Sequence, residues 1–330
     1  MRPTVSDAVT RWARPALVLA GLAVVGYLLA RVGPLAVWNT ISTLGWRLLL
    51  VLLVPYMLVV VLDTLGWQVL FHGAHVPFSV LLRVRLAGEA VNLTTPTASV
   101  GGEPVKAYLL RPYMSLADAF AVIIVDKTTV VAGQSLFLVA GLAAGTRLLP
   151  PSSTLMTAMI MLLAVEIVAL AGFILVQMRG VFGGSGRILA RLGLTASSRY
   201  QTGLESLDDA LAMFYRKRRG RLLASAALHA AGWATNSIEV YLVLTWLDLS
   251  ASPLAAFVIE SFAAAVKFAS FMVPANLGVL EGGYIAFFAA LGFSGAVGLS
   301  FTLIRRLREA VWGALGFLAL ASLRARPSAS

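Results

Sequence analysis

Long runs of apolar residues, interrupted by isolated charges, dominate this chain. They cover about residues 15–30, 46–71, 116–144, 154–178, 222–246 and 294–323. A helix that crosses a bilayer needs roughly 20 apolar residues. The strands of a transmembrane barrel would alternate apolar and polar positions, and these runs do not. The pattern therefore predicts an all-α polytopic membrane protein with about six full transmembrane helices.

Two further segments are too charged for a simple span and too apolar for a loop. They cover about residues 78–112 and 253–292. Each contains an apolar run broken by Pro, Gly and a carboxylate, in the strings "TPTASVGGEPVKAYLL" and "VPANLGVLEGGYIAFF". Broken backbone at membrane depth is tolerated only inside protein or beside a watery cavity. We therefore predict two re-entrant helical hairpins.

The two broken segments share one spacing of Pro, acid and cation. Pro96 is followed 7 residues later by Glu103 and after a further 24 by Lys127, and the same steps lead from Pro274 to Glu281 and Arg305. A single offset of 178 residues relates the two sets. Pro253 and Glu260 also lie seven apart, so the Pro–Glu step alone is not distinctive. The cation that follows in each set is what indicates a repeat. Interruptions at corresponding positions in two halves point to a transport site.

Composition agrees with a membrane protein and removes several classes of site. Only 12% of the residues are charged, against about 25% in soluble proteins, and the mean hydropathy is +0.87. A net charge of +11 is typical of basic loops beside anionic lipid, so no nucleic-acid partner is predicted. The chain has no cysteine and three scattered histidines, His72, His75 and His229. Neither a metal nor a cofactor is predicted.

Charge also predicts the topology. Residues 179–221 hold nine Lys or Arg against three Asp or Glu, and both ends of the chain are basic. The positive-inside rule places all three in the cytoplasm. The two hairpins then enter from opposite faces, as an inverted repeat of about residues 46–145 and 222–323 within one domain, 1–330. Apolar residues around 204–215 recur at helical spacing, which favours a helix lying on anionic lipid or one packing on its own protein.

Four charges inside the apolar runs are the first candidates for a site: Glu103, Lys127, Glu281 and Arg305. Each ionisable group costs about 2.5–3.5 kcal/mol to insert, so it persists where it pairs or faces a cavity. The spacing predicts two symmetry-related pairs, Glu103 with Lys127 and Glu281 with Arg305. Their cations suit a lipid phosphate, and their carboxylates suit a cationic headgroup or a proton. Internal salt bridges that pin the hairpins are the alternative.

Other residues extend this set. Under the same offset Glu89 matches Lys267 with opposite charge, and Asn276 lies in the second broken segment. We include all three as substrate-binding candidates. Arg305 and Glu309, four apart, are expected to pair along one helix face. Asp126 and Lys127 are adjacent and should meet different partners.

The strings "VGGEPVKAYLLRP" with "SLADAFAVIIVDK", and "VPANLGVLEGGYIAFFAALG" with "LIRR", resemble a known family. It is the transmembrane, flippase-like region of lysylphosphatidylglycerol synthase, which also occurs as stand-alone membrane proteins. The resemblance covers roughly residues 15–323. It implies movement of a lipid headgroup across the membrane, and Glu103, Glu281 and Arg305 match the family pattern. Members often have Glu-Arg where this chain has Asp126-Lys127, so the headgroup preference is open. We expect no synthase domain in these 330 residues, so the resemblance does not imply aminoacyl transfer.

A lipid translocase, or flippase, of the bacterial inner membrane is therefore the leading hypothesis. A phospholipid, hopanoid or polyprenyl-linked lipid would be its partner, with a homo-oligomer left open. A non-transporting accessory protein that scaffolds a lipid- or glycan-modifying pathway is the alternative. A lipid-modifying enzyme is a third, but the chain contains neither G-x-S-x-G nor H-E-x-x-H. We expect a transporter rather than an enzyme.

Overall fold

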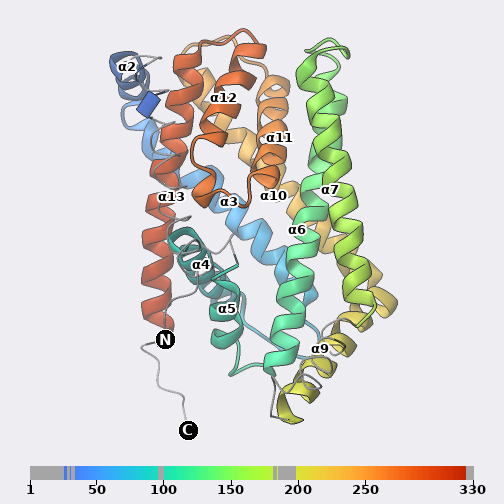
Figure 1. Cartoon of the computed structure of the whole chain (residues 1–330). Coiled ribbons are helices and arrows are strands. Elements are labelled where there is room, and N and C mark those ends of the chain that lie inside the picture. Colours follow the sequence, from blue (N-terminus) through green and yellow to red (C-terminus); the bar gives the residue numbers. More distant parts are fainter. Residues whose placement is uncertain are drawn as a thin grey trace, which may run out of the picture.

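The computed structural model describes residues 26–27, 30, 34–95, 100–180, 184 and 198–324. Within these residues the fold is all helical, with no strand (Figure 1). The helices are α2 (Pro34–Leu44), α3 (Arg47–Leu70), α4 (Phe78–Thr94), α5 (Glu103–Leu109), α6 (Leu116–Gly145), α7 (Thr154–Met178), α9 (Ser198–Lys217), α10 (Arg219–Trp246), α11 (Pro253–Ala269), the short 3-10 helix η1 (Pro274–Asn276), α12 (Val279–Ala290) and α13 (Gly295–Arg324). The expected first span, 15–30, lies almost wholly outside the described residues.

Three helices, α3, α6 and α7, are long and apolar enough to cross a membrane. Their bounds fall within a few residues of three predicted spans. Helix α7 exposes apolar side chains along its length, including Ile160, Val165 and Val168. An apolar surface of this extent is suited to lipid rather than to water. Helices α10 and α13, with 28 and 30 residues, are as long but carry internal charges.

Both broken segments form a helix, a break and a second helix. In the first, the turn before α5 packs so closely on α4 that a Cβ on Gly102 would lie 2.0 Å from the Gly88 carbonyl oxygen. In the second, Ala275, Asn276 and Gly278 have φ angles of 52°, 52° and 81°. Non-glycine residues rarely adopt this left-handed conformation, so the break between α11 and α12 is held in place by its surroundings. Pro96 lies outside the described residues.

The helix order of the first half recurs in the second. Helices α3, α4, α5 and α6 correspond to α10, α11, α12 and α13, and the first residues of α6 and α13, Leu116 and Gly295, are 179 positions apart. Helix α6 ascends and α13 descends in the view of Figure 1, while α4 and α5 lie in the lower half and α11 and α12 in the upper half. Helix α3 packs along α10.

Helix α9 matches the amphipathic segment expected around residues 204–215. Its apolar residues Leu207, Leu211 and Phe214 are buried in a cluster with residues of α6, including Val122 and Ile123. Of the two alternatives for this helix, packing against its own protein is the one observed. Arg221, just beyond it, donates to the carbonyls of Val69 (2.9 Å) and Phe71 (2.7 Å) and ties the start of α10 to the end of α3.

Candidate functional site

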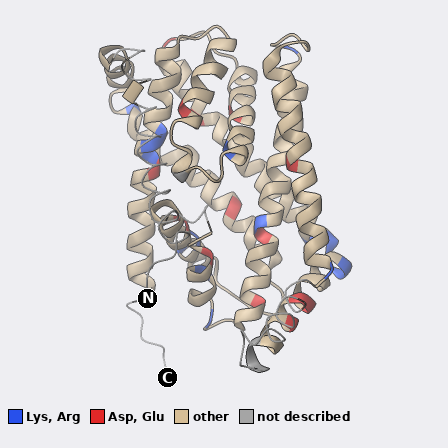
Figure 2. Cartoon of the chain, in the orientation of Figure 1, with Lys and Arg blue, Asp and Glu red and all other residues tan. Residues whose placement is uncertain are grey.

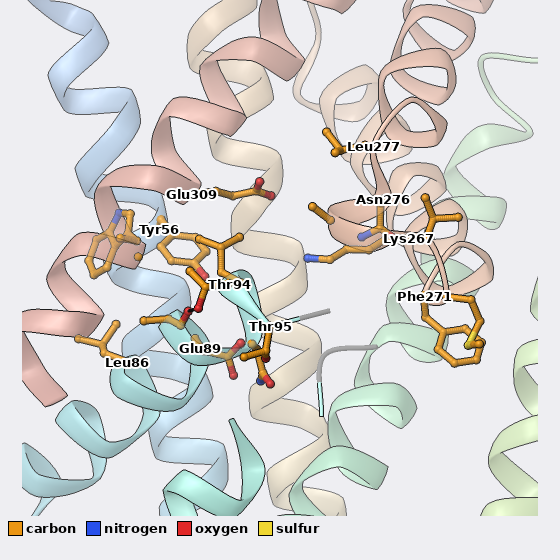
Figure 3. Close-up of a pocket in the computed structure, with 18 residues that line it drawn as sticks. Tyr56, Leu86, Glu89, Thr94, Thr95, Lys267, Phe271, Asn276, Leu277 and Glu309 are labelled. Atoms are coloured by element: carbon orange, nitrogen blue, oxygen red, sulfur yellow. Dashed lines mark hydrogen bonds between the residues drawn. The ribbon is translucent and has the colours of Figure 1, made fainter. Parts of the chain in front are cut away.

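Charged residues lie within α3, α6, α11 and α13 as well as near some of their ends (Figure 2). Two adjoining chambers, of about 410 and 290 Å³, open among them. The residues that line both chambers are Tyr56, Leu86, Glu89, Lys267, Phe271, Asn276 and Glu309. They come from α3, α4, α11, the break after α11, and α13. Both hairpins therefore contribute to one cavity (Figure 3).

The first charge network surrounds Glu103, the first residue of α5. Its Oε1 lies 2.8 Å from Lys127 Nζ and 3.4 Å from Lys106 Nζ, and accepts a hydrogen bond from Asn92. Lys106 in turn pairs with Glu89 at 2.9 Å. Glu103 and Lys106 are buried, whereas the side chains of Lys127 and Glu89 are 37% and 42% exposed. The network thus presents one ammonium and one carboxylate to the cavity.

The second network surrounds Arg305 on α13. The guanidinium contacts Glu260 on α11 at 2.7 Å and Glu239 on α10 at 3.2 Å. Arg308 also pairs with Glu239, and the Tyr284 hydroxyl donates to Glu260 at 2.9 Å. Both carboxylates are almost completely buried. Arg305 therefore has its charge neutralised inside the protein.

A third network holds the second hairpin, and it corrects two predicted pairings. Glu281 pairs with Arg306 at 2.7 Å, not with Arg305. Glu309 also pairs with Arg306, at 2.9 Å, and again not with Arg305. Arg306 further donates to the Ala275 carbonyl at 2.8 Å, which anchors the left-handed turn. The contact with the hairpin is therefore made by Arg306, the residue after the predicted Arg305.

A fourth network lies where α3, α4, α6 and α10 meet. Arg85 contacts Asp63 at 3.2 Å and Asp126 at 3.5 Å. His229 lies between the same two carboxylates, with Nδ1 2.7 Å from Asp63 and Nε2 3.0 Å from Asp126. Asp126 and its neighbour Lys127 therefore meet different partners, as predicted.

Lys267 differs from the other charges of the cavity. It reaches in from α11 towards the side on which Glu89 and Glu309 lie (Figure 3), and it lies 5.8 Å from the centre of the Trp233 ring. Among the ion pairs of the described residues, none includes Lys267. Asn276 lines both chambers and accepts from Ser270 through its Oδ1 at 2.7 Å, so its amide NH₂ is the group that can donate. An ammonium and an amide donor are thus available to an anion.

The structure brings most of the sequence-predicted residues together. Glu89, Lys127, Lys267, Asn276 and Arg305 line the cavity, whereas Glu103 and Glu281 lie behind its wall. Further charged residues of the networks were not named as site residues: Asp63, Arg85, Lys106, Asp126, His229, Glu239, Glu260, Arg306, Arg308 and Glu309. The seven-residue step from Pro253 to Glu260 was one available signal. The other signal was the presence of charges inside apolar runs.

Residues 12–316 match the sequence profile of the family described as the lysylphosphatidylglycerol synthase TM region. The chain belongs to this family. The predicted resemblance is thereby confirmed, and the protein is a membrane protein with transmembrane helices. No solved structure matches it.

One relative of similar length is consistent with a stand-alone member of the lysylphosphatidylglycerol synthase TM region family. A UPF0104 membrane protein of Methanothermobacter thermautotrophicus (strain Delta H) is 24% identical over 310 residues, covering 88% of this chain and 89% of the relative. The similarity therefore extends over nearly the whole of both proteins.

Proposed function

We propose that this protein moves a polar lipid headgroup across a bacterial inner membrane, through the cavity between its two broken hairpins. The observation that carries the proposal is the cavity itself. Side chains from both halves line it, and Lys267 faces it without an ion-pair partner in the described part of the chain. Uncompensated charge at membrane depth is costly, so a ligand that neutralises the ammonium would stabilise the site.

The proposed topology follows from the same features. About six spans and two re-entrant hairpins would form an inverted repeat, with both termini and the basic segment 179–221 in the cytoplasm. The opposite directions of α6 and α13 support this arrangement. Rocking of one repeat against the other would expose the cavity to each side in turn. The lipid tails would stay in the bilayer while the headgroup crosses.

The charges that face the cavity suit a headgroup with a phosphate. Lys267 and the Asn276 amide offer donors on one side, and the carboxylates of Glu89 and Glu309 lie on the other (Figure 3). A phosphate would occupy the donor side, and a headgroup amine would suit the acidic side. We do not assign this role to Arg305, because Glu239 and Glu260 already neutralise it.

The test is translocation of a fluorescent phosphatidylglycerol in liposomes that contain the purified full chain. Lys267→Gln should lower the initial rate at least tenfold, because about 1.4 kcal/mol of lost charge-assisted binding already gives that factor. Lys217→Gln is the matched control, since Lys217 is exposed on α9 outside the cavity. Equal rates for Lys267→Gln and wild type would overturn the site.

The accessory-protein alternative makes the opposite prediction. It requires the basic segment near residues 216–221 for function and leaves the cavity charges dispensable. Arg221 must be kept in such a test, because it joins α10 to α3 through two carbonyls. If the protein is a translocase, neutralising Arg216, Lys217 and Arg219 alone should leave translocation in liposomes unchanged.

A further inference from the structure

His229 lies on α10 where that helix crosses α3 and α6. Its side chain is completely buried. Glycines on both neighbouring helices make room for it. A Cβ on Gly66 would lie 2.9 Å from His229 Nε2, and one on Gly133 would lie 2.9 Å from His229 Cβ. The imidazole is therefore enclosed by backbone, and its position is fixed.

Each ring nitrogen of His229 faces a carboxylate. Nδ1 lies 2.7 Å from Asp63 Oδ1, and Nε2 lies 3.0 Å from Asp126 Oδ1. A neutral imidazole carries one N–H, so it can donate to one of these oxygens and would turn a lone pair towards the other. The imidazolium donates to both. The geometry therefore fits a doubly protonated His229.

Charge balance leads to the same state. Asp63 and Asp126 together carry two negative charges against the single positive charge of Arg85. An unpaired buried charge is destabilising, and one proton on His229 makes this cluster of Asp63, Asp126, Arg85 and His229 neutral.

The cluster is open to the cavity on one side. Asp63 and Asp126 line the 290 Å³ chamber, whereas His229 does not. Asp63 is the more accessible carboxylate, with 22% of its side chain exposed against 6% for Asp126. Arg85 occupies the second oxygen of each carboxylate, so the described residues leave no cluster that could hold a metal ion. The exchangeable ligand that fits here is a proton.

We propose that Asp63, His229 and Asp126 form a proton-binding site, and that its protonation is coupled to movement of the headgroup through the adjoining cavity. The inference rests on the proposed function. On release, the Nδ1–H bond of His229 breaks, an O–H bond forms on Asp63, and Asp63 passes the proton to water. The groups facing the imidazole are Asp63 from α3 and Asp126 from α6, with Arg85 from α4 behind them. Proton loss leaves a net negative charge beside Lys127, which lines the same chamber.

The protonation state can be measured without transport. The full chain, labelled with ¹⁵N-histidine, is placed in liposomes of phosphatidylethanolamine and phosphatidylglycerol for solid-state NMR, and His229→Gln assigns the signal. Both ring nitrogens of His229 should be protonated at neutral pH, and Asp63→Asn should change that state. A singly protonated, neutral His229 at neutral pH would overturn the proposal.

Coupling is measured as the response of fluorescent phosphatidylglycerol translocation to a pH gradient across the same liposomes. One pH unit should bias the lipid distribution about tenfold per coupled proton. His229→Gln and Asp63→Asn should abolish the bias, whereas His72→Gln, an exposed histidine, should keep it. Gradient-independent translocation by wild type would overturn the coupling and leave the proposed function standing. A wild-type protein that moves no lipid would defeat the proposed function, and the coupling with it.

Discussion

The two hairpins have an acid and a cation at the same sequence spacing, but these residues form different ion pairs. In the first half, Glu103 pairs with Lys127, which lies 24 residues later. In the second half, Glu281 pairs with Arg306, which lies 25 residues later. The residue at the 24-residue step, Arg305, turns instead into the protein and pairs with Glu260 and Glu239. The repeated spacing thus places the same types of charge in both halves, but the ion pairs that they form differ.

The helix registers account for the difference. Glu103 is the first residue of α5, whereas Glu281 is the third residue of α12. In that position Glu281 Oε2 accepts from the Gly278 backbone N–H at 2.7 Å. The carboxylate therefore caps its own helix and meets a different position of α13. Two arginines in succession allow one to serve the hairpin and the other the buried network.

The largest effect expected from this comparison is on stability. Arg305→Met leaves Glu260 without an ion-pair partner in a fully buried position, which should lower the free energy of unfolding by about 3–5 kcal/mol. Lys127→Met removes a partly exposed ammonium, and Lys106 still serves Glu103, so a loss below about 1 kcal/mol is expected. Unfolding in mixed detergent micelles measures both. Equal losses would break the distinction between the two networks.

Two glycines near the breaks, Gly102 before α5 and Gly282 in the first turn of α12, should respond differently to one added methyl group. Gly102→Ala places a Cβ 2.0 Å from the Gly88 carbonyl oxygen and should cost about 1–3 kcal/mol. Gly282→Ala meets nothing within 4 Å and should be neutral or stabilising by up to about 1 kcal/mol, since alanine favours helix. The midpoint of thermal unfolding compares them. A neutral Gly102→Ala would show that α4 and α5 are not closely packed.

A smaller difference is expected for the polar residues that close each break. Asn92 accepts from the Gly102 N–H at 2.7 Å and donates to Glu103, so Asn92→Ala should cost about 1–2 kcal/mol. Ser270→Ala removes a hydroxyl that lies 2.7 Å from Oδ1 of the partly exposed Asn276 and 2.8 Å from the Val266 carbonyl, for about 0.5–1 kcal/mol. Thermal unfolding should rank Asn92→Ala as the more destabilising. The reverse order would place the tighter turn in the second hairpin.

Much of the helical plan was predictable from the sequence. Apolar runs gave the positions of α3, α6, α7, α10 and α13, because length and hydropathy are local properties. Pro and Gly within apolar runs indicated the two breaks, because their effect on the backbone is also local. Helix α2 was missed, since its mixed polar and apolar sequence has no comparable signal. The membership of the family rested on the two broken segments.

The contacts of the site were harder to predict. Which arginine meets Glu281 depends on where α12 begins and how α13 is rotated, and neither is a property of spacing alone. The bracket of Asp63 and Asp126 around His229 joins three helices that are far apart in sequence. Each residue was visible as a polar position in an apolar run. Their meeting depends on the packing of α10 against α3 and α6.

Entry of a lipid headgroup into the cavity can be detected by crosslinking from a thiol on the cavity wall. The chain has no cysteine, so Thr94→Cys, at the cavity wall, and Val168→Cys, exposed on α7, each give a single thiol. Both are placed in liposomes with phosphatidylethanolamine that carries a maleimide on its headgroup, and mass spectrometry detects the adduct. A lipid adduct is expected on Thr94→Cys and none on Val168→Cys. A Thr94→Cys protein that reacts with a small soluble maleimide but never with the lipid would contradict this expectation.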